Sequence, residues 1–198
     1  MQPHPISTIA VYCGSSPGNQ PEYCEQAAQT GRLIASRGMG IVYGGAKVGV
    51  MGAVADGALA AGGTVTGILP QFLEAREVAH HGLTELIMVE TMHERKLMMY
   101  ERADAILALP GGFGTMEELF EMLTWAQLGL HQKPIGLLNT GGFYDPLLLL
   151  AETMFRKGFI REAHRHIFIH DTEPEALLKK IEAFTPPQLG KLMTRDRI

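Results

Sequence analysis

Short apolar runs alternate with amphipathic stretches along most of the chain. The runs lack polar alternation, which is typical of strands that are buried on both faces of a sheet. We expect such strands at residues 8–13, 40–43, 64–69, 85–89, 103–109, 134–138 and 166–169. Apolar residues at helical spacing between them predict helices at residues 22–37, 50–61, 92–102, 115–128, 145–157 and 174–183.

This alternation of strands and helices favours right-handed βαβ crossovers. It predicts an α/β, Rossmann-like doubly wound fold, with a mostly parallel sheet of about seven strands and helices on both faces. We expect residues 1–184 to form a single nucleotide-binding domain. Residues 185–198 are expected to be a loosely held tail, because prolines are followed there by mixed charge without apolar periodicity.

Composition and charge narrow the possible partners. The 198 residues are 46% hydrophobic and carry a formal net charge of −4, which argues against broad binding to nucleic acid or to an anionic membrane. No apolar run approaches the roughly 20 residues that cross a bilayer, and the start does not resemble a secretion signal. With only Cys13 and Cys24, a reduced, cytoplasmic protein is expected.

The most informative loop follows the strand expected at residues 103–109. It reads Pro110-Gly111-Gly112-Phe113-Gly114-Thr115 and leads into Met116-Glu117-Glu118. Glycines let the backbone come close to a ligand, and the free N–H groups of a helix start favour a phosphate. Glu117 and Glu118 point about 100° apart on a helix, so at most one is well aimed into a cleft. The alternative is that both carboxylates only complement the helix dipole.

Two further strands end in loops of small residues. Cys13-Gly14-Ser15-Ser16 follows the first strand and Tyr43-Gly44-Gly45-Ala46-Lys47 follows the second. Each alone is compatible with an ordinary turn, and the second lacks the Gly-Lys-Ser/Thr ending of a P-loop. A parallel sheet would gather these loops at one edge with the loop after Pro110, which favours a shared ligand site.

Arg95 and Lys96 lie near the start of the helix expected at residues 92–102. Two cations there oppose the helix dipole, so a bound anion or a neighbouring carboxylate should compensate them, unless they are simply solvated. Arg95 is too basic to donate a proton, so it would orient substrate and stabilise charge. Glu77 could bind ribose hydroxyls or merely face water, and Thr124 could touch a substrate at its base end. The eight histidines show no metal spacing, so no metal site is expected.

Two motifs together identify a family. Met92-His93-x-Arg95-Lys96, followed by Pro110-Gly111-Gly112-x-Gly114-Thr115-x-x-Glu118, resembles the Lonely Guy family of cytokinin-activating nucleoside 5′-monophosphate phosphoribohydrolases, often mislabelled lysine decarboxylases. The similarity extends over most of the chain, from the Cys13 loop to Gly141-Gly142-Phe143-Tyr144. Ala46 departs from it, because many relatives have a third glycine there.

The resemblance implies a homodimer that hydrolyses the N-glycosidic bond of a purine or cytokinin nucleoside 5′-monophosphate. The products would be the free base and ribose 5-phosphate, and no cofactor or metal would be required. Arg95 and Glu118 would be the catalytic pair. Four expected substrate contacts come from the glycine loops: Gly14, Ser15, Gly44 and Gly45. The resemblance implies further substrate contacts at Glu77, Lys96, Gly111, Gly112, Phe113, Gly114, Thr115, Met116, Glu117 and Thr124.

Two other functions remain open at this point. A non-catalytic nucleotide sensor could use the same loops, although it would have no need for a carboxylate beside the sugar. Amino-acid decarboxylation would need pyridoxal phosphate on a lysine, normally in a much larger chain.

Overall fold

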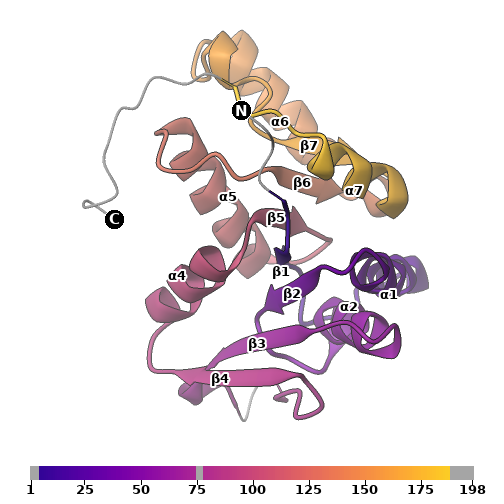
Figure 1. Ribbon diagram of the computed structural model, residues 1–198. Helices are drawn as coiled ribbons and strands as arrows, with labels where there is room; N and C mark the ends of the chain where they lie inside the picture. The colour runs from indigo at the N-terminus through magenta and orange to yellow at the C-terminus, as the bar shows by residue number, and fades with distance from the viewer. Residues whose placement is uncertain (1–4, 75–77, 188–198) are drawn as a thin grey trace.

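The computed structural model describes residues 5–74 and 78–187. They form one seven-stranded sheet with the order β4-β3-β2-β1-β5-β6-β7, in which every neighbouring pair is parallel (Figure 1). This confirms the predicted doubly wound α/β fold. The strands are β1 (Thr8–Tyr12), β2 (Gly40–Tyr43), β3 (Val65–Pro70), β4 (Glu85–Val89), β5 (Ala105–Ala108), β6 (Ile135–Leu138) and β7 (Ile169–Asp171).

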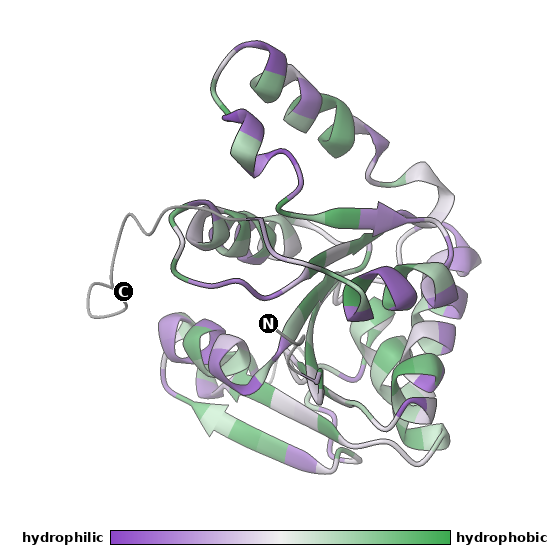
Figure 2. Cartoon of the chain, turned by 45° about the horizontal axis from the view of Figure 1, so that its top comes forward, coloured by the Kyte–Doolittle hydropathy of each residue, from purple (hydrophilic) through white to green (hydrophobic). Residues whose placement is uncertain are grey.

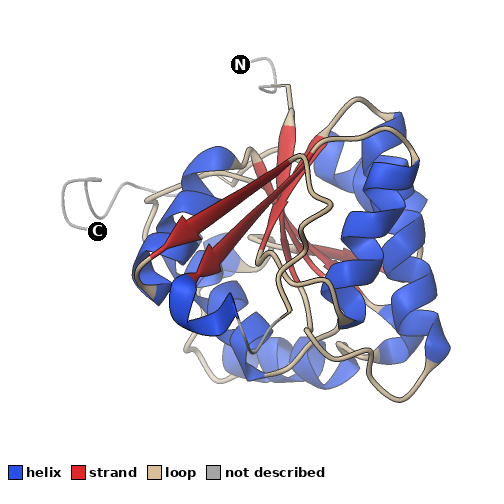
Figure 3. Ribbon diagram, turned by 90° about the horizontal axis from the view of Figure 1, so that it is seen from below, coloured by secondary structure: helices blue, strands red, loops and turns tan. Residues whose placement is uncertain are grey.

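Helices cover both faces of the sheet (Figure 3). Three short 3-10 helices were not expected: η1 (Gln71–Leu73), η2 (Thr140–Gly142) and η3 (Glu162–His164). The α-helices are α1 (Pro21–Ser36), α2 (Gly49–Ala60), α4 (Met92–Arg102), α5 (Phe113–Gln127), α6 (Asp145–Arg156) and α7 (Pro174–Glu182).

The core lies in two layers, one on each side of the sheet. Ile9 and Val11 of β1 join a buried cluster with α1, α2 and α7, whereas Ala10 and Tyr12 join a second cluster with α4 and α5. Successive strand residues point to opposite faces, so a strand that is buried on both faces must be apolar throughout. Figure 2 shows the consequence, because the central strands are largely hydrophobic while the helices carry both kinds of residue.

The strand order places a switch point at the middle of the sheet. β1 pairs with β2 on one side (Thr8↔Gly40) and with β5 on the other (Ile9↔Ala105). The chain runs outward through β2, β3 and β4 and then returns to β5, so the loops after β1 and β5 leave the sheet side by side. Ligands of open parallel sheets bind at such a point, beyond the carboxyl ends of the strands.

Some element boundaries differ from the expectation. The last strand was expected at residues 166–169, but β7 spans Ile169–Asp171. β7 pairs only with β6 and lies at the edge of the sheet, so it can carry the exposed residue His170. The apolar run at residues 166–169 therefore did not mark the bounds of this strand. α5 begins at Phe113, two residues before the expected start. From position 188 on, the tail expected at residues 185–198 lies outside the described residues.

Within residues 5–74 and 78–187, none of the helices combines the length and the apolar character needed to span a bilayer.

Candidate active site

The first turn of α5 provides an anion seat at the carboxyl end of β5. Gly112 is the N-cap of α5 in an extended conformation and has no side chain to accept hydrogen bonds from the first-turn amides. A Cβ atom added at Gly112 or Gly114 would have no other atom within 4 Å, so this turn borders open space. Free N–H groups beside open space, at the positive end of a helix dipole, suit a phosphate.

The loops after β1 and β5 are in direct contact. The Gly14 amide donates to the Pro110 carbonyl at 3.1 Å, and the Met51 amide at the start of α2 donates to the Gly14 carbonyl at 3.0 Å. A Cβ atom at Gly111 would lie 2.7 Å from the Gly14 nitrogen and 2.8 Å from the Thr115 Cβ atom. Only glycine allows this close approach, and it brings two of the three small-residue loops together.

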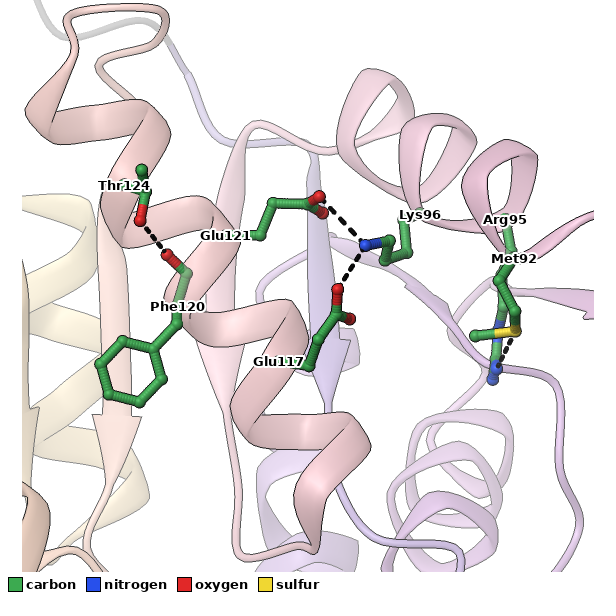
Figure 4. A network of polar contacts seen from close by, with 7 residues as sticks. All are labelled: Met92, Arg95, Lys96, Glu117, Phe120, Glu121 and Thr124. Carbon is green, nitrogen blue, oxygen red and sulfur yellow. Dashed lines mark hydrogen bonds and ion pairs between the residues drawn. The ribbon is translucent and has the colours of Figure 1, made fainter.

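Arg95 reaches the third loop from α4. Its side chain is buried, and Nη2 donates to the Gly44 carbonyl at 2.9 Å. Nη1 lies 3.9 Å from the Met92 sulfur, one turn earlier on α4 (Figure 4). A Cβ atom at Gly44 would overlap Nη2, so this glycine leaves the space that the guanidinium fills.

The start of α4 is closed by a capping box. The Glu94 amide donates to Thr91 Oγ1 at 3.1 Å, and the Glu94 carboxylate accepts from the Thr91 amide at 3.3 Å and from the Glu90 amide at 2.8 Å. This carboxylate satisfies donors at the positive end of the helix, where the two cations Arg95 and Lys96 are unfavourable.

Lys96 is clamped between two carboxylates of α5. Its ammonium lies 2.5 Å from Glu117 Oε1 and 3.0 Å from Glu121 Oε1 (Figure 4). Burial lowers the pKa of the Lys96 ammonium, but the hydrogen bonds to Glu117 and Glu121 outweigh this effect and raise the pKa above its ordinary value. The sequence left open whether a bound anion or a neighbouring carboxylate compensates the charge of Lys96. The structure shows that neighbouring carboxylates do so.

Glu118 is buried, whereas the side chain of Glu117 is 56% exposed, so the two neighbours diverge as their helical spacing predicts. Burial raises the pKa of the Cys13 thiol, the Glu118 carboxylate adds to this rise, and the Arg95 guanidinium opposes it. Glu118 and Arg95 therefore both act on the carboxyl end of β1, one from α5 and one from α4. A buried acid and a buried guanidinium therefore both lie within electrostatic reach of Cys13 at this end of the sheet.

Comparison with known proteins places this geometry in a family. Residues 51–181 match the model of a family described as "Possible lysine decarboxylase". A probable cytokinin riboside 5′-monophosphate phosphoribohydrolase of Oryza sativa subsp. japonica (LOGL1) is 46% identical over 177 residues, covering 89% of this chain and 79% of the relative. The Arabidopsis thaliana enzyme LOG1 is 42% identical over 178 residues, covering 90% of this chain and 84% of the relative. The chain belongs to the Lonely Guy family.

Solved structures share this Lonely Guy fold. The molybdenum cofactor binding protein of Rippkaea orientalis has a TM-score of 0.67 at 25% identity, covering 89% of this chain and 96% of that protein. The molybdenum cofactor carrier protein of Chlamydomonas reinhardtii has a TM-score of 0.67 at 20% identity, covering 90% and 99%. These likenesses concern the arrangement of the sheet and helices.

The structure brings together some of the expected Lonely Guy site residues and not others. Ser15 and Phe113 are exposed beside the seat, and the Phe113 side chain is 96% exposed. Thr124 Oγ1 donates to the Phe120 carbonyl at 2.7 Å, and Thr124 lies away from Lys96 on another side of α5 (Figure 4). Glu77 lies outside the described residues.

Thr124 instead lines a groove of about 640 Å³ between α5, α6 and the η3–β7 segment. Neither Arg95 nor Glu118 contributes to its lining, which is mostly apolar and includes Phe120, Phe155 and Phe159. The groove is therefore separate from the seat at the switch point.

Sequence reasoning missed Glu121 and the contact between His80 and Asp56. Glu121 follows Glu117 by one helical turn, and this i, i+4 spacing puts both carboxylates on one face, which could have indicated a shared cation. The His80–Asp56 contact joins α2 to a loop, and no spacing in the sequence predicts it. Across the described residues, no group of three or more His, Cys, Asp or Glu side chains is arranged to hold a metal ion.

Proposed function

We propose that this Lonely Guy chain hydrolyses the N-glycosidic bond of purine or cytokinin nucleoside 5′-monophosphates. The products are the free base and ribose 5-phosphate. Relatives at 42–46% identity carry the name cytokinin riboside 5′-monophosphate phosphoribohydrolase, and they align over most of this chain. The observation that carries the proposal is the combination of two buried charged side chains, Glu118 of α5 and Arg95 of α4, with the uncapped first turn of α5.

The chemistry of the bond suits this arrangement. Breaking a ribosyl C–N bond builds positive charge on the sugar, which a carboxylate near the anomeric carbon stabilises while it orients or deprotonates the attacking water. Glu118 takes this role. Arg95 positions the substrate and offsets the negative charge of the carboxylates.

The phosphate supplies binding energy far from the bond that breaks. The amides of the first turn of α5 hold the 5′-phosphate, and the glycines around them let it approach. Binding energy from this remote group aligns the ribose with Glu118, so a nucleoside without phosphate reacts poorly.

The name of the matched family model refers to decarboxylation, but the environment of Lys96 does not suit this reaction. Pyridoxal phosphate chemistry needs a lysine that loses its proton readily to form a Schiff base. The pKa of Lys96 is shifted in the opposite direction, because Glu117 and Glu121 hold its ammonium.

The test is incubation of the purified protein with AMP and with isopentenyladenosine monophosphate, followed by chromatography of the bases and assay of ribose 5-phosphate. We expect equal amounts of base and sugar phosphate. Glu118→Gln should lower kcat by about 100-fold or more while substrate still binds. Glu101→Gln, on the exposed end of α4, is the matched control and should behave like the wild type. Tight binding of AMP that stays intact would support a sensor instead.

The exposed apolar surface on and just after α6 supports a homodimer. Within the described chain, α6 buries none of its twelve residues, and Leu149, Leu150 and Phe159 are 64%, 49% and 80% exposed. An apolar surface of this kind on a soluble chain marks an association site, and a second copy of the chain offers a matching apolar face. Sedimentation should give a dimer, and Leu150→Asp with Phe159→Asp should give a monomer; a wild-type monomer at micromolar concentration would overturn this assignment.

We also propose that the protein is cytoplasmic. Cys13 and Cys24 are free thiols, which supports a reducing compartment.

A further inference from the structure

Residues 78–80 are held against the loop that follows β2. The Lys47 amide donates to the Val78 carbonyl at 2.9 Å, and the His80 amide donates to the Gly45 carbonyl at 2.9 Å. Ala46 and Ala79 form an antiparallel bridge between these two contacts. The two short segments therefore form a small ribbon beside the parallel sheet.

The ribbon contains a strained residue. Val78 has φ of +47°, and among the described residues it is the only one other than glycine with positive φ. A β-branched residue is unfavourable in this region, and it persists only where its surroundings fix it. The Val78 side chain is 52% exposed, so packing of that side chain supplies little of the restraint. Among the described contacts, the backbone ladder with residues 45–47 restrains Val78.

His80 anchors the ribbon to α2. Its side chain is 5% exposed, and both ring nitrogens have partners. The Gly82 amide donates to Nδ1 at 3.1 Å, so in the neutral ring Nε2 carries the hydrogen and donates to Asp56 Oδ1 at 3.0 Å. Asp56 lies on α2, which packs closely against α1 and the sheet.

The anchored loop carries the carbonyl that holds Arg95. Gly44 precedes Gly45, the acceptor of the His80 amide, and its carbonyl accepts from Arg95 Nη2 at 2.9 Å. Displacement of this loop would therefore displace the guanidinium. Asp56, the His80 ring, the Gly45 backbone and the Gly44 carbonyl form a continuous series of contacts that ends on Arg95.

We propose that His80, oriented by Asp56, is a positioning residue for Arg95. This inference rests on the proposed hydrolase function. Asp56 and the Gly82 amide occupy both ring nitrogens of His80, so its effect on the site passes through the Gly44–Gly45 backbone. Loss of the anchor should lower kcat, because the guanidinium leaves its catalytic position. KM should change little, because the phosphate binds at α5.

Four variants test the anchor with AMP as substrate. His80→Ala and Asp56→Ala should lower kcat by about 10–100-fold and leave KM within about twofold, as expected for a misplaced catalytic group. His80→Gln and Asp56→Asn should each retain most of kcat. The glutamine amide can still donate a hydrogen bond to Asp56, and the asparagine oxygen can still accept one from His80. Asp56 is 64% exposed, so Asp56→Ala is expected to fold even if His80→Ala does not. His81→Ala, at an exposed neighbouring position, is the control and should match the wild type.

A double-mutant cycle separates positioning from general destabilisation. In an Arg95→Ala background, His80→Ala should cause no further loss of kcat if His80 acts through Arg95. A loss that adds in full to that of Arg95→Ala would overturn the proposal, as would a kcat for Asp56→Ala within twofold of the wild type.

Hydrogen exchange gives a readout that does not require turnover. The Lys47 amide is bonded across the ribbon, so His80→Ala and Asp56→Ala should speed its exchange by about tenfold or more, and His81→Ala should not. If the wild type releases no base, the hydrolase function and the catalytic role of His80 both fail, and exchange alone decides whether the anchor exists. If the wild type is active and neither exchange nor kcat responds, only the anchor fails.

Discussion

The clamp around Lys96 makes a quantitative prediction about stability. The Lys96 side chain is 10% exposed and links α4 to α5 through Glu117 and Glu121, whose side chains are 56% and 25% exposed. Lys96→Met removes the charge and all three donors while it keeps the aliphatic stem. The substitution therefore isolates the ionic part of the contact between the two helices.

The magnitude follows from the exposure of the two partners. The contact with Glu117 is open to water and contributes up to about 1 kcal/mol. The contact with Glu121 is more enclosed and contributes about 1.5–3 kcal/mol, as is usual for a hydrogen bond to a charged group. Without the cation, the two carboxylates one turn apart repel each other by about 0.3–0.5 kcal/mol. The sum is about 2–4.5 kcal/mol, which corresponds to a fall in Tm of about 4–18 °C for a chain of this length.

The pH dependence has a definite sign. The pKa of Lys96 is raised by folding, so the clamp stabilises fully below the unfolded lysine pKa of about 10.4 and is lost only as the pH rises through the higher folded value. The difference between Lys96→Met and the wild type should therefore stay constant across neutral pH. It should shrink in strong alkali, where the ammonium loses its proton.

Thermal unfolding by calorimetry measures this difference. A cycle of Lys96→Met, Glu121→Gln and the double variant should give a coupling free energy of about 1.5–3 kcal/mol, the contribution of that contact. The control is Arg102→Met at the end of α4, which breaks an exposed contact with Glu85 of β4 and should cost less than about 1 kcal/mol. If Lys96→Met and Glu121→Gln each leave Tm within about 1 °C of the wild type, the reasoning from exposure is refuted.

Three further substitutions test other contacts. Gly44→Ala places a methyl group where Arg95 Nη2 lies, so steady-state kinetics should show a loss of about 10–100-fold in kcat; wild-type kcat would contradict the placement of the guanidinium. Gly111→Ala crowds the first turn of α5, so it should raise KM for AMP and destabilise by about 1–3 kcal/mol in a denaturant titration; an unchanged KM would argue against the seat. The hydrogen bond from Lys180 lowers the pKa of Asp171, so its stabilisation is present above the unfolded value near 4 and is lost as the pH falls through the folded value. Asp171→Asn should therefore cost about 0.5–1 kcal/mol at neutral pH and much less near pH 3, and an equal Tm difference at both pH values would contradict this.

The sheet could be predicted from the sequence because its central strands are buried on both faces. A strand such as residues 105–108 must be apolar at every position, so its run stands out against the amphipathic helices. β7 escaped this rule because an edge strand with one neighbour can carry His170 and Asp171. The start of α5 was missed because Gly112 gives no side-chain capping signal.

The candidate site was less predictable than the fold. The two motifs indicated Arg95 and Glu118, and helical spacing correctly predicted that Glu117 and Glu118 diverge. The identity of the groups that compensate Lys96 depends on how α4 packs against α5, which the spacing along one helix does not determine. The partner of His80 could not be predicted either. Asp56 lies on α2, and β3 separates α2 from His80 along the chain.

The central position of β1 has a consequence for how the nascent chain folds. β1 leaves the ribosome before the other strands of the sheet, and β2, β3 and β4 can build half of the sheet beside it during synthesis. Its second edge stays open until residues 105–108 emerge, and an open strand edge is a template for aggregation. The Gly14–Pro110 contact cannot form earlier, so a ligand that requires this contact cannot stabilise any translation intermediate that is shorter than this point.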